Sequence, residues 1–563
     1  MKIEAFKIGD YVVANDFDDL FVEGYIIEMT NNRVLIRNVN RCSIFESYLA
    51  FITKDYYSEE DIIDYKTGVT QMKIASSVGA EFTLELTELI ERITSRCVKE
   101  INELRTRKGE YQNQSELSNF TYEQSIAYTE IQNWILSTTP DSLLKRLVGY
   151  AGTGKTYTIS RCIQGLPVEA PLKILLCSPT NKALKVLKGN FESANNNSLI
   201  EYQFLTIAQT LGKQPVENNQ KMEEEFLTIN PKELDKYQVI IVDEYSMINQ
   251  ENLEDLLIKY GGKVLFVGDN AQLAPINEKS PPVDDLEEFI NGDNTWRLTE
   301  VVRYSGQVGL LAYELRDSSP RKINRADFSG DDTLIWLQGR DGVKRTLKAA
   351  SNRFSEDPNS FRILAHKNKT CADYNEQFRL YLWGLHADDC PYHVGERLIA
   401  KSPVYRGAAD IGKVKILNNS DEFTLEKPAT LKEAMASEIL PDYTNILGRL
   451  DKYKWKYWSL PYGFHSLRVI DEEMTGEYQK LLKKLQSSKD KIDRQAFWRL
   501  KSEVFDNIGY AYALTTHKAQ GSTFDSVLIL WDELQARYLD NTESRRLTYT
   551  AITRCKSCAY CLV

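Results

Sequence analysis

A glycine-rich segment that ends in lysine and threonine has the residue types needed to bind a phosphate chain. The segment GYAGTGKT at 149–156 lies between the apolar Leu147-Val148 and a helix-compatible stretch, YTISRCI. In a strand–loop–helix context, backbone N–H groups and the helix N-terminus hold the β- and γ-phosphates. Lys155 is expected to neutralise phosphate charge, and the Thr156 hydroxyl to ligate Mg²⁺. The residues predicted to form this site are Gly149, Ala151, Gly152, Thr153, Gly154, Lys155 and Thr156.

Two acids follow an apolar run in VIIVDE at 239–244, which is typical of a buried parallel strand. Asp243 is placed to hold Mg²⁺, and Glu244 to orient or deprotonate a water molecule. A second apolar run, in VLFVGDNAQLAP, precedes Gln272. Open parallel sheets bind ligands at the carboxyl ends of their strands, so Gln272 is predicted to reach the γ-phosphate or the attacking water. The alternative for Gln272 is an amide in a surface loop.

Two arginines, Arg303 in LTEVVRY and Arg554 in YTAITRCK, are candidates for stabilising charge on a transferred phosphoryl group. A guanidinium spreads positive charge across several γ-phosphate oxygens. From the residues alone, a surface ion pair is the simpler interpretation of each arginine.

Composition limits the classes of protein that can position these groups. The chain has 563 residues, with 70 Lys and Arg against 80 Asp and Glu, so the net charge of −10 excludes a uniformly basic nucleic-acid coat but permits a local basic channel. The sequence contains no run of about eighteen apolar residues, so we expect no membrane span. The first residues, MKIEAFKIGD, show no apolar stretch typical of a secretory signal. Nine scattered cysteines are not typical of a disulfide framework. We therefore expect a multidomain protein of the cytoplasm; the resemblance described below implies the cytosol of a bacterium or a phage-infected host.

The pattern of apolar residues divides the chain into parts. Residues 1–75 alternate short apolar runs with turn residues, which predicts a small β-barrel or SH3-like module, and residues 76–116 predict a helix and a linker. Residues 1–66 contain 7 Lys and Arg against 13 Asp and Glu, which favours protein docking or a structural cap over phosphate binding. From about residue 117, short apolar strands alternate with helical patterns, as in parallel α/β layers.

Taken together and in order, these segments resemble superfamily-one DNA helicases of the B branch, of the RecD/Dda type. The resemblance rests on FTYEQ at 120–124 and on GYAGTGKT, SPTNKALKVL, TIAQTL, VDEYSM, GDNAQLAP, LTEVVRY, TTHKAQGSTF and RRLTYTAITRCK. It covers about 430 residues, from about residue 121 to the end of the chain. Residues 361–379 and 497–521 are most similar to the Dda type, whereas the N-terminal 115 or so residues have no counterpart there.

The resemblance implies an ATP-dependent helicase that moves 5′→3′ along single-stranded DNA. It implies two RecA-like domains, at 117–305 and 306–563, with ATP and Mg²⁺ between them. The implied partners are single-stranded DNA and forked or tailed duplexes, with the enzyme acting as a monomer and its N-terminal module free to bind a replication or recombination protein. Alternatives are a helicase that remodels RNA or RNA–DNA hybrids, and a recruitment factor whose affinity is switched by ATP.

The resemblance also assigns roles residue by residue. Gln124 would read adenine, Lys155 and Thr156 hold phosphate and Mg²⁺, Asp243 holds Mg²⁺, and Glu244 is the catalytic base. Gln272 would sense the γ-phosphate, Arg303 and Arg554 act as arginine fingers, and Gly521 belongs to the nucleotide site. The residues implied to contact DNA are Pro179, Thr180, Asn181, Lys182, Thr206, Thr516, His517 and Lys518.

Two inserts are expected from the same resemblance. Residues of about 207–237 match a β-hairpin pin, with Phe226 aligned to the aromatic tip that splits the duplex; the alternative is that Phe226 packs the hairpin onto its domain. Residues of about 405–505 match an SH3-like module with a tower. There, 452–458 alternates lysines with aromatic residues, which favours a half-buried strand with solvated lysines over a DNA-tracking face.

The cysteines near the C-terminus, Cys555, Cys558 and Cys561, are spaced closely enough to suggest a metal site. They have no clear fourth ligand and lie on an expected core strand, so buried thiols are the favoured interpretation.

Overall fold

The computed structural model describes residues 11–16, 20–29, 34–38, 52–57 and 62–65, together with 120–563 except 193–197, 219–221, 276, 291–293, 318–322, 388–389, 409–411, 440–448, 452 and 537–540. Two compact units, 1–120 and 121–563, are described separately. The helix and linker predicted at 76–116 lie outside the described residues.

The N-terminal unit contains a five-stranded antiparallel sheet of order β4-β3-β2-β1-β5. Neighbouring strands mostly follow one another in the chain, as the alternating runs and turn residues predict. Closure of this sheet into a barrel stays a prediction, since no pairing of β4 with β5 is found among the described residues. The strands are β1 (Tyr11–Asp16), β2 (Leu20–Met29), β3 (Val34–Asn38), β4 (Ile52–Tyr57) and β5 (Ile62–Tyr65).

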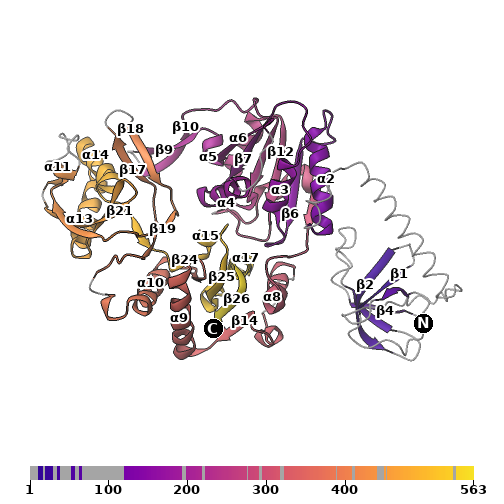
Figure 1. The fold of residues 1–563 in the computed structure, drawn as a ribbon. Coiled ribbons are helices and arrows are strands. Elements are labelled where there is room, and N and C mark those ends of the chain that lie inside the picture. The colour runs from indigo at the N-terminus through magenta and orange to yellow at the C-terminus, as the bar shows by residue number, and fades with distance from the viewer. Residues whose placement is uncertain are drawn as a thin grey trace. The chain divides into compact units, whose positions relative to one another are not determined.

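The second unit begins with a six-stranded parallel sheet of order β13-β6-β12-β11-β7-β8 (Figure 1). Nearly every residue of its central strands is buried, including Lys145 and Arg146 of β6, because helices cover both faces of the sheet. The strands are β6 (Leu144–Gly149), β7 (Leu172–Ser178), β8 (Ile200–Thr206), β11 (Val239–Asp243), β12 (Lys263–Gly268) and β13 (Thr295–Leu298). The helices are α2 (Tyr122–Leu136), α3 (Lys155–Gln164), α4 (Asn181–Glu192), α5 (Ile207–Thr210), α6 (Gln250–Lys259) and α7 (Glu287–Ile290).

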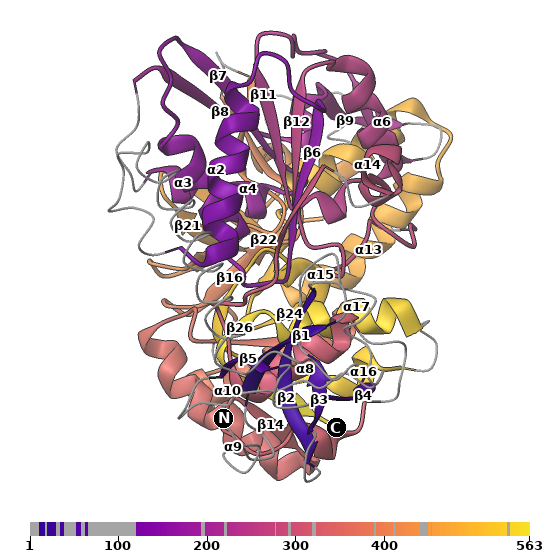
Figure 2. The same ribbon diagram turned by 90° about the vertical axis from the view of Figure 1, so that its right-hand side faces the viewer.

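A second parallel sheet, of order β14-β26-β25-β15-β24, follows in the chain; Figure 2 shows β6, β11 and β12 of the first sheet above β24 and β26 of the second. The strands are β14 (Leu334–Leu337), β15 (Phe361–Ala365), β24 (Ala513–Thr515), β25 (Phe524–Leu530) and β26 (Cys555–Leu562). The helices are α8 (Gly306–Asp317), α9 (Gly339–Glu356), α10 (Asn368–Trp383), α15 (Thr516–Ala519), α16 (Trp531–Leu534) and α17 (Asn541–Ile552). Two parallel sheets with helices confirm the predicted α/β class with two RecA-like layers.

Antiparallel sheets interrupt the second parallel sheet between α10 and β24. They pair as β19-β16-β23, β17-β18 and β20-β21-β22. The strands are β16 (Arg397–Ala400), β17 (Val404–Ala408), β18 (Gly412–Leu417), β19 (Glu422–Thr424), β20 (Thr430–Ala434), β21 (Trp455–Tyr462), β22 (His465–Ile470) and β23 (Ile508–Tyr510), and the helices are α11 (Ala436–Ile439), α13 (Glu472–Ser487) and α14 (Lys491–Arg499). The likeness of this insert to an SH3 module stays a prediction, as do the predicted domain bounds.

The first sheet carries a hairpin of its own, β9 (Lys213–Asn218) paired with β10 (Glu223–Thr228). In Figure 1 this hairpin extends from the first sheet toward β17 and β18 of the insert. Met222, at the turn of the hairpin, is buried in a core cluster with Trp455 and Phe505 of the insert. The hairpin is therefore anchored at both ends.

On β21, Trp455 and Tyr457 are buried, whereas Lys454 pairs with Glu433 at 3.1 Å and Lys456 with Glu473 at 2.6 Å. This arrangement supports the half-buried strand with solvated lysines; Lys452 lies outside the described residues.

Candidate nucleotide and nucleic-acid site

The predicted nucleotide-binding residues gather at the carboxyl edge of the first sheet. Strands β6, β12 and β11 are neighbours, and they end at Gly149, Gly268 and Asp243. Because parallel strands end on the same side of a sheet, the loops that follow them meet there, which is where open α/β sheets bind ligands. The sequence separates Gly149 from Asp243 by almost a hundred residues, and the sheet order brings them together.

The loop after β6 has the backbone shape of a phosphate cradle. Gly152 and Gly154 have φ of 87° and 76°, in the left-handed region that favours glycine. A Cβ at Gly149 would lie 2.7 Å from the Leu298 carbonyl oxygen, so this position also requires glycine. The Lys155 ammonium lies inside the loop, donating to the carbonyl oxygens of Gly149 and Tyr150 at 2.8 and 2.9 Å.

Thr156 and Asp243 form a ligand pair that suits a hard divalent cation. The Thr156 hydroxyl donates to Asp243 Oδ2 at 3.0 Å. Burial, with the nearby charge of Glu244, raises the pKa of Asp243 to about 7. A carboxylate that is costly to ionise without a counter-charge, beside a hydroxyl oxygen, fits Mg²⁺ chemistry.

Glu244 is held in a strained conformation. Its φ of 55° and ψ of 44° place it in the left-handed region, which non-glycine residues rarely adopt. Its Oε2 atom is buried without a hydrogen-bond partner among the residues that the structure describes. Strain and an unpartnered carboxylate oxygen are features of functional sites, and both agree with the predicted role as catalytic base.

Two guanidinium groups reach this edge, Arg303 from the segment after β13 of the first sheet and Arg554 from the second layer. Arg554, just before β26, lies 3.4 Å from Gln272 Oε1 through its Nη2, and Arg303 donates from Nη1 to the Thr553 carbonyl oxygen at 3.3 Å. Burial, and then the charge of Arg554, lowers the pKa of Arg303. Burial lowers the pKa of Lys155 as well, with the charge of Arg303 acting in the same direction. The cationic groups of Lys155, Arg303 and Arg554 are therefore close enough to repel one another. A bound polyphosphate would offset this repulsion with its negative charge.

Gln124 contacts the phosphate loop directly. Its Nε2 donates to the Thr153 carbonyl oxygen at 2.8 Å, while its Oε1 accepts from the Thr121 amide at 3.0 Å in the capping box of α2. A Cβ at Gly154 would lie 2.6 Å from Gln124 Nε2, so the glutamine also explains that glycine. Its place beside the loop is as predicted, and its reading of adenine stays a prediction.

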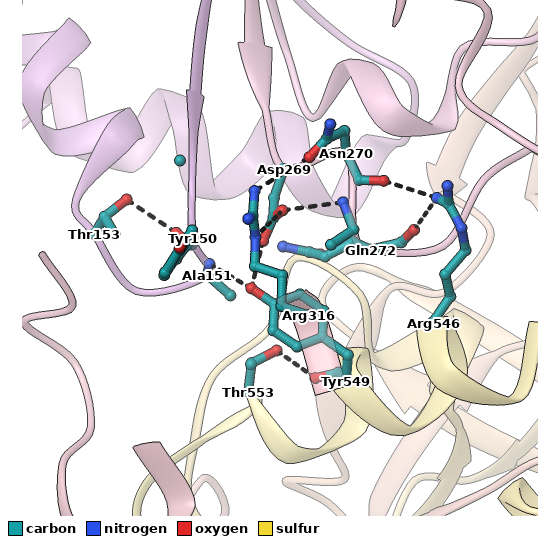
Figure 3. A network of polar contacts seen from close by, with 12 residues as sticks. Tyr150, Ala151, Thr153, Asp269, Asn270, Gln272, Arg316, Arg546, Tyr549 and Thr553 are labelled. Carbon is teal, nitrogen blue, oxygen red and sulfur yellow. Dashed lines mark hydrogen bonds and ion pairs between the residues drawn. The ribbon is translucent and has the colours of Figure 1, made fainter. Parts of the chain in front are cut away.

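Residues that sequence reasoning did not single out complete the site (Figure 3). Tyr549 on α17 accepts a hydrogen bond from the Ala151 amide at 3.0 Å and donates to Asp269 Oδ2 at 2.6 Å. Arg546, one turn earlier, donates to the carbonyl oxygens of Asn270 and Gln272 at 2.8 and 2.7 Å. The helical spacing of 546, 549 and 553 places these residues on one face, but it does not identify the residues that this face meets.

The segments predicted to contact DNA also lie next to each other, one from each of the two parallel-sheet layers. Pro179, Thr180, Asn181 and Lys182 lie after β7 and at the start of α4, and His517 and Lys518 lie on α15. Lys182 Nζ reaches the Lys518 carbonyl oxygen at 3.3 Å, and a Cβ at Gly521 would lie 3.6 Å from Ala183 Cβ. Gly521 also precedes Ser522, whose carbonyl oxygen lies 3.3 Å from Arg554 Nη1, so this segment joins the DNA-side and nucleotide-side residues.

The Lys182 ammonium is already paired with the Glu422 carboxylate. Lys182 Nζ and Arg362 Nη2 pair with its two oxygens at 2.8 and 2.7 Å, and Arg397 Nη2 lies at 3.4 Å. Although burial alone would raise it, the charges of Arg362 and Lys182 hold the pKa of Glu422 at about 2. The cluster joins the first sheet, the second sheet and the insert, and it leaves an excess of positive charge.

Two of the predicted DNA contacts are buried. Thr206 caps α5, where its hydroxyl accepts from the Gln209 amide at 3.3 Å. Thr516 is fully buried, with its hydroxyl 3.4 Å from the Ala365 carbonyl oxygen. Because these hydroxyls are used locally, the geometry argues against direct side-chain contacts with DNA at both positions.

The prediction that Phe226 forms the tip of the pin is wrong. Phe226 pairs with Pro215 on the arm of the hairpin, and the turn lies between Asn218 and Glu223. Phe226 is 57% exposed, so the alternative of packing against its own domain is not observed either. Counting residues back from Asp243 could not place the turn, because strand register determines which residue reaches the tip.

The cysteines of β26 do not form a metal site. Successive side chains of a strand point to opposite faces, and Cys555 and Cys561 are buried in a core cluster while Cys558 is not part of it. No group of three or more His, Cys, Asp or Glu side chains placed to hold a metal ion occurs among the described residues. In the described part of the chain, no helix has the length and apolar content of a membrane span.

Known proteins match the chain on both sides of the interface. Residues 129–331 match the family model of an AAA domain, and residues 510–560 match that of a UvrD-like helicase C-terminal domain. The ATP-dependent DNA helicase dda of Enterobacteria phage T4 is 25% identical over 435 residues, covering 72% of this chain and 91% of that protein. The uncharacterized protein R530 of Acanthamoeba polyphaga mimivirus is 24% identical over 488 residues, covering 72% and 93%.

Among solved structures, the Pif1 helicase from Candida albicans is 15% identical with a TM-score of 0.39, covering 79% of this chain and 94% of that one. The similar identities of dda and R530 give only weak support to a particular closeness to the Dda type. The two matched family models and the similarity to dda, together with the phosphate loop and its paired acids, support an ATP-hydrolysing DNA helicase of superfamily one, B branch.

Proposed function

We propose that this protein is an ATP-dependent DNA helicase that moves 5′→3′ on single-stranded DNA and separates the duplex ahead of it. The observation that carries the proposal is the convergence of Lys155, Arg303 and Arg554 from two RecA-like layers beside the acids Asp243 and Glu244. A site built from both layers can change shape when a polyphosphate binds or is cleaved. This coupling is what a translocating motor requires.

ATP binds with its phosphates on the loop amides and Lys155. Thr156 and Asp243 would hold Mg²⁺, which would neutralise charge on the phosphate oxygens when bound. Glu244 orients a water molecule and accepts its proton as the water oxygen attacks the γ-phosphorus, while the bond from that phosphorus to the β–γ bridging oxygen breaks and ADP leaves. Gln272, Arg303 and Arg554 stabilise the charge that spreads over the γ-oxygens in the transition state.

Single-stranded DNA lies across the segments at 179–182 and 516–518. Their adjacency through Lys182 and the Lys518 carbonyl oxygen supports a track that crosses both layers. Contacts of this kind are mostly to phosphates, so binding is tolerant of sequence and weakens steeply with salt. The β9–β10 hairpin acts as the separating element, with Phe226 contributing an exposed aromatic face from its arm.

The enzyme acts as a monomer, and the N-terminal unit recruits a protein of replication or recombination. The acidic balance of residues 1–66, 7 cations against 13 anions, supports protein docking rather than DNA binding there.

The test is strand separation on partial duplexes with either a 5′ or a 3′ single-stranded tail. The full chain should unwind only the 5′-tailed substrate, in the presence of ATP and Mg²⁺. Unwinding only from a 3′ tail would overturn the polarity, and hydrolysis without unwinding of either would overturn the helicase activity. Replacing the DNA tail with RNA should reduce activity; equal activity would favour an RNA remodeller.

A further inference from the structure

Helix α17 of the second layer is hydrogen-bonded to the loop that follows β12 in the first layer. Arg546 holds the backbone of this loop at Asn270 and Gln272, and Tyr549 holds the Asp269 carboxylate. Arg554 follows the helix directly and reaches Gln272. Helix α17 therefore carries both groups that orient the loop of the γ-phosphate sensor (Figure 3), and the proposed arginine finger follows it by two residues.

The Tyr549 hydroxyl links three parts of the site. It accepts from the Ala151 amide in the phosphate loop, and it donates to Asp269, which is fully buried. The other Asp269 oxygen lies 3.4 Å from Arg316 Nε and accepts from the Ala271 amide at 3.1 Å. Although burial alone would raise it, the charges of Arg316 and Lys155 lower the pKa of Asp269, so the hydroxyl donates to a charged acceptor.

We propose that Tyr549, assisted by Arg546, is a positioning residue for ATP hydrolysis: its hydroxyl fixes the phosphate loop and the loop of Gln272 in register with helix α17, so that Gln272 and Arg554 reach the γ-phosphate together. This inference rests on the proposed function and deepens it. Tyr549 touches no reacting atom; it acts through Ala151, Asp269 and the loop between them. A change of phosphate-loop shape is passed to the second layer through this hydroxyl.

A second tyrosine provides a matched comparison within the same chain. Tyr512 accepts from the Arg397 amide at 3.2 Å and donates to the buried Glu396 at 2.8 Å, and Glu396 pairs with Arg379 at 2.8 Å. The chemistry is the same as that of Ala151, Tyr549, Asp269 and Arg316. The Tyr512 set, however, lies wholly within the part of the chain after residue 360 and does not reach the phosphate loop.

The experiment compares Tyr549→Phe with Tyr512→Phe in the full chain. Each variant loses one hydroxyl with two hydrogen bonds and keeps its ring, so the two melting temperatures should fall by similar amounts. With a single-stranded oligothymidylate present, Tyr549→Phe should lower kcat for ATP roughly ten-fold with little change in KM, since a hydrogen bond to a charged group is lost. Tyr512→Phe should leave kcat and KM unchanged.

Equal kcat values for the two variants would overturn the inference and reduce Tyr549 to a structural role. A rise in KM without a fall in kcat would overturn it too, because positioning acts on turnover. If Tyr549→Phe does not fold, Arg546→Gln, which removes the other grip on the loop, should lower kcat in the same way; an unchanged kcat there would be equally contrary. Wild-type protein without DNA-stimulated hydrolysis would instead contradict the proposed function itself.

Discussion

The two parallel sheets of this protein share an architecture but divide the chemistry between them. In the first sheet, the ends of β6 and β11 carry the phosphate loop and the acids Asp243 and Glu244. The second sheet has no such loop in its described strand ends, and it contributes Tyr549 and Arg554 from the segment between β25 and β26. Layered α/β architecture does not by itself set function; the loops at the strand ends do.

Because the two layers contribute different groups, nucleotide binding and turnover should be separable by mutation. Groups of the first sheet surround the site where the nucleotide is bound, whereas groups of the second sheet complete it only when the two layers meet. Variants of the first-layer groups that hold the phosphates should therefore affect nucleotide affinity, and variants in the second layer should affect the rate of hydrolysis.

The largest effect is expected for Lys155→Ala in the first layer. Loss of the ammonium inside the phosphate loop should weaken ATP binding and abolish detectable hydrolysis and unwinding. Titration with a fluorescent ATP analogue and a steady-state ATPase assay measure both. Lys173→Ala, which removes an exposed lysine paired with Glu201 on the same sheet, is the control and should behave as wild type. Full ATPase activity in Lys155→Ala would contradict the assignment of the phosphate site.

Arg554→Ala should distinguish the role of the second layer from that of the first most clearly. Removal of an arginine finger is expected to lower kcat about 10³-fold, while the affinity for ATP changes little. Single-turnover hydrolysis and equilibrium binding, measured side by side, check this. Arg325→Ala removes an exposed arginine that pairs with Asp532 in the second layer and should change neither. If the affinity for ATP fell as much as kcat, Arg554 of the second layer would contribute to ATP binding as much as to hydrolysis.

Glu422→Gln tests the junction on the DNA side, where the layers meet through charges. The folded-state pKa of Glu422 is about 2, below its ordinary value of 4.5, so its ionised form stabilises the fold above pH 4.5 and this stabilisation is lost as the pH falls toward 2. The variant should lose on the order of 3 kcal/mol of unfolding free energy at pH 7.

Urea unfolding between pH 3 and pH 7 measures this dependence, and the difference between variant and wild type should shrink as the pH falls. Glu433→Gln, an exposed partner of Lys454, is the control and should show no such trend. If the difference in unfolding free energy between variant and wild type did not change with pH, packing rather than charge would stabilise the junction of the layers.

The smallest effect is expected for Lys454→Ala in the insert. Lys454 and Glu433 are both largely exposed, at 63% and 52%, so their pair is worth about 0.5 kcal/mol or less. DNA affinity and its salt dependence should also be unchanged, as measured by fluorescence anisotropy at several salt concentrations. A shallower salt dependence would show that the lysine face of β21 contacts phosphates after all.

Local patterns predicted the nucleotide side of the site well. The glycines of the phosphate loop, Lys155 and Thr156 are contiguous, so their spacing alone describes a loop and the start of a helix. Asp243 and Glu244 could be recognised because a buried strand ends at them. Gln124 could be named only through a resemblance, since its contact with Thr153 spans 29 residues.

The sequence could not predict features that depend on register or on partners far along the chain. Phe226 was assigned to the tip of the hairpin, but the pairing of Glu223 with Asn218 puts the turn elsewhere. Lys182 was expected to be available to DNA, yet it pairs with Glu422, which is 240 residues away. Tyr549 lay within a recognised segment, and nothing in that segment indicates that its hydroxyl meets Ala151.

Contiguous stretches of the chain specify the chemistry available to this protein: a phosphate loop, an acid pair and strands apolar enough to be buried between helices. These features follow from contiguous residues, whose spacing dictates local backbone shape and burial. Which of these groups act together depends on how the whole unit folds. Sheet order and the meeting of two layers set the distances between Ala151, Asp269, Tyr549 and Arg554, and such long-range distances depend on the packing of the whole unit rather than on any one segment.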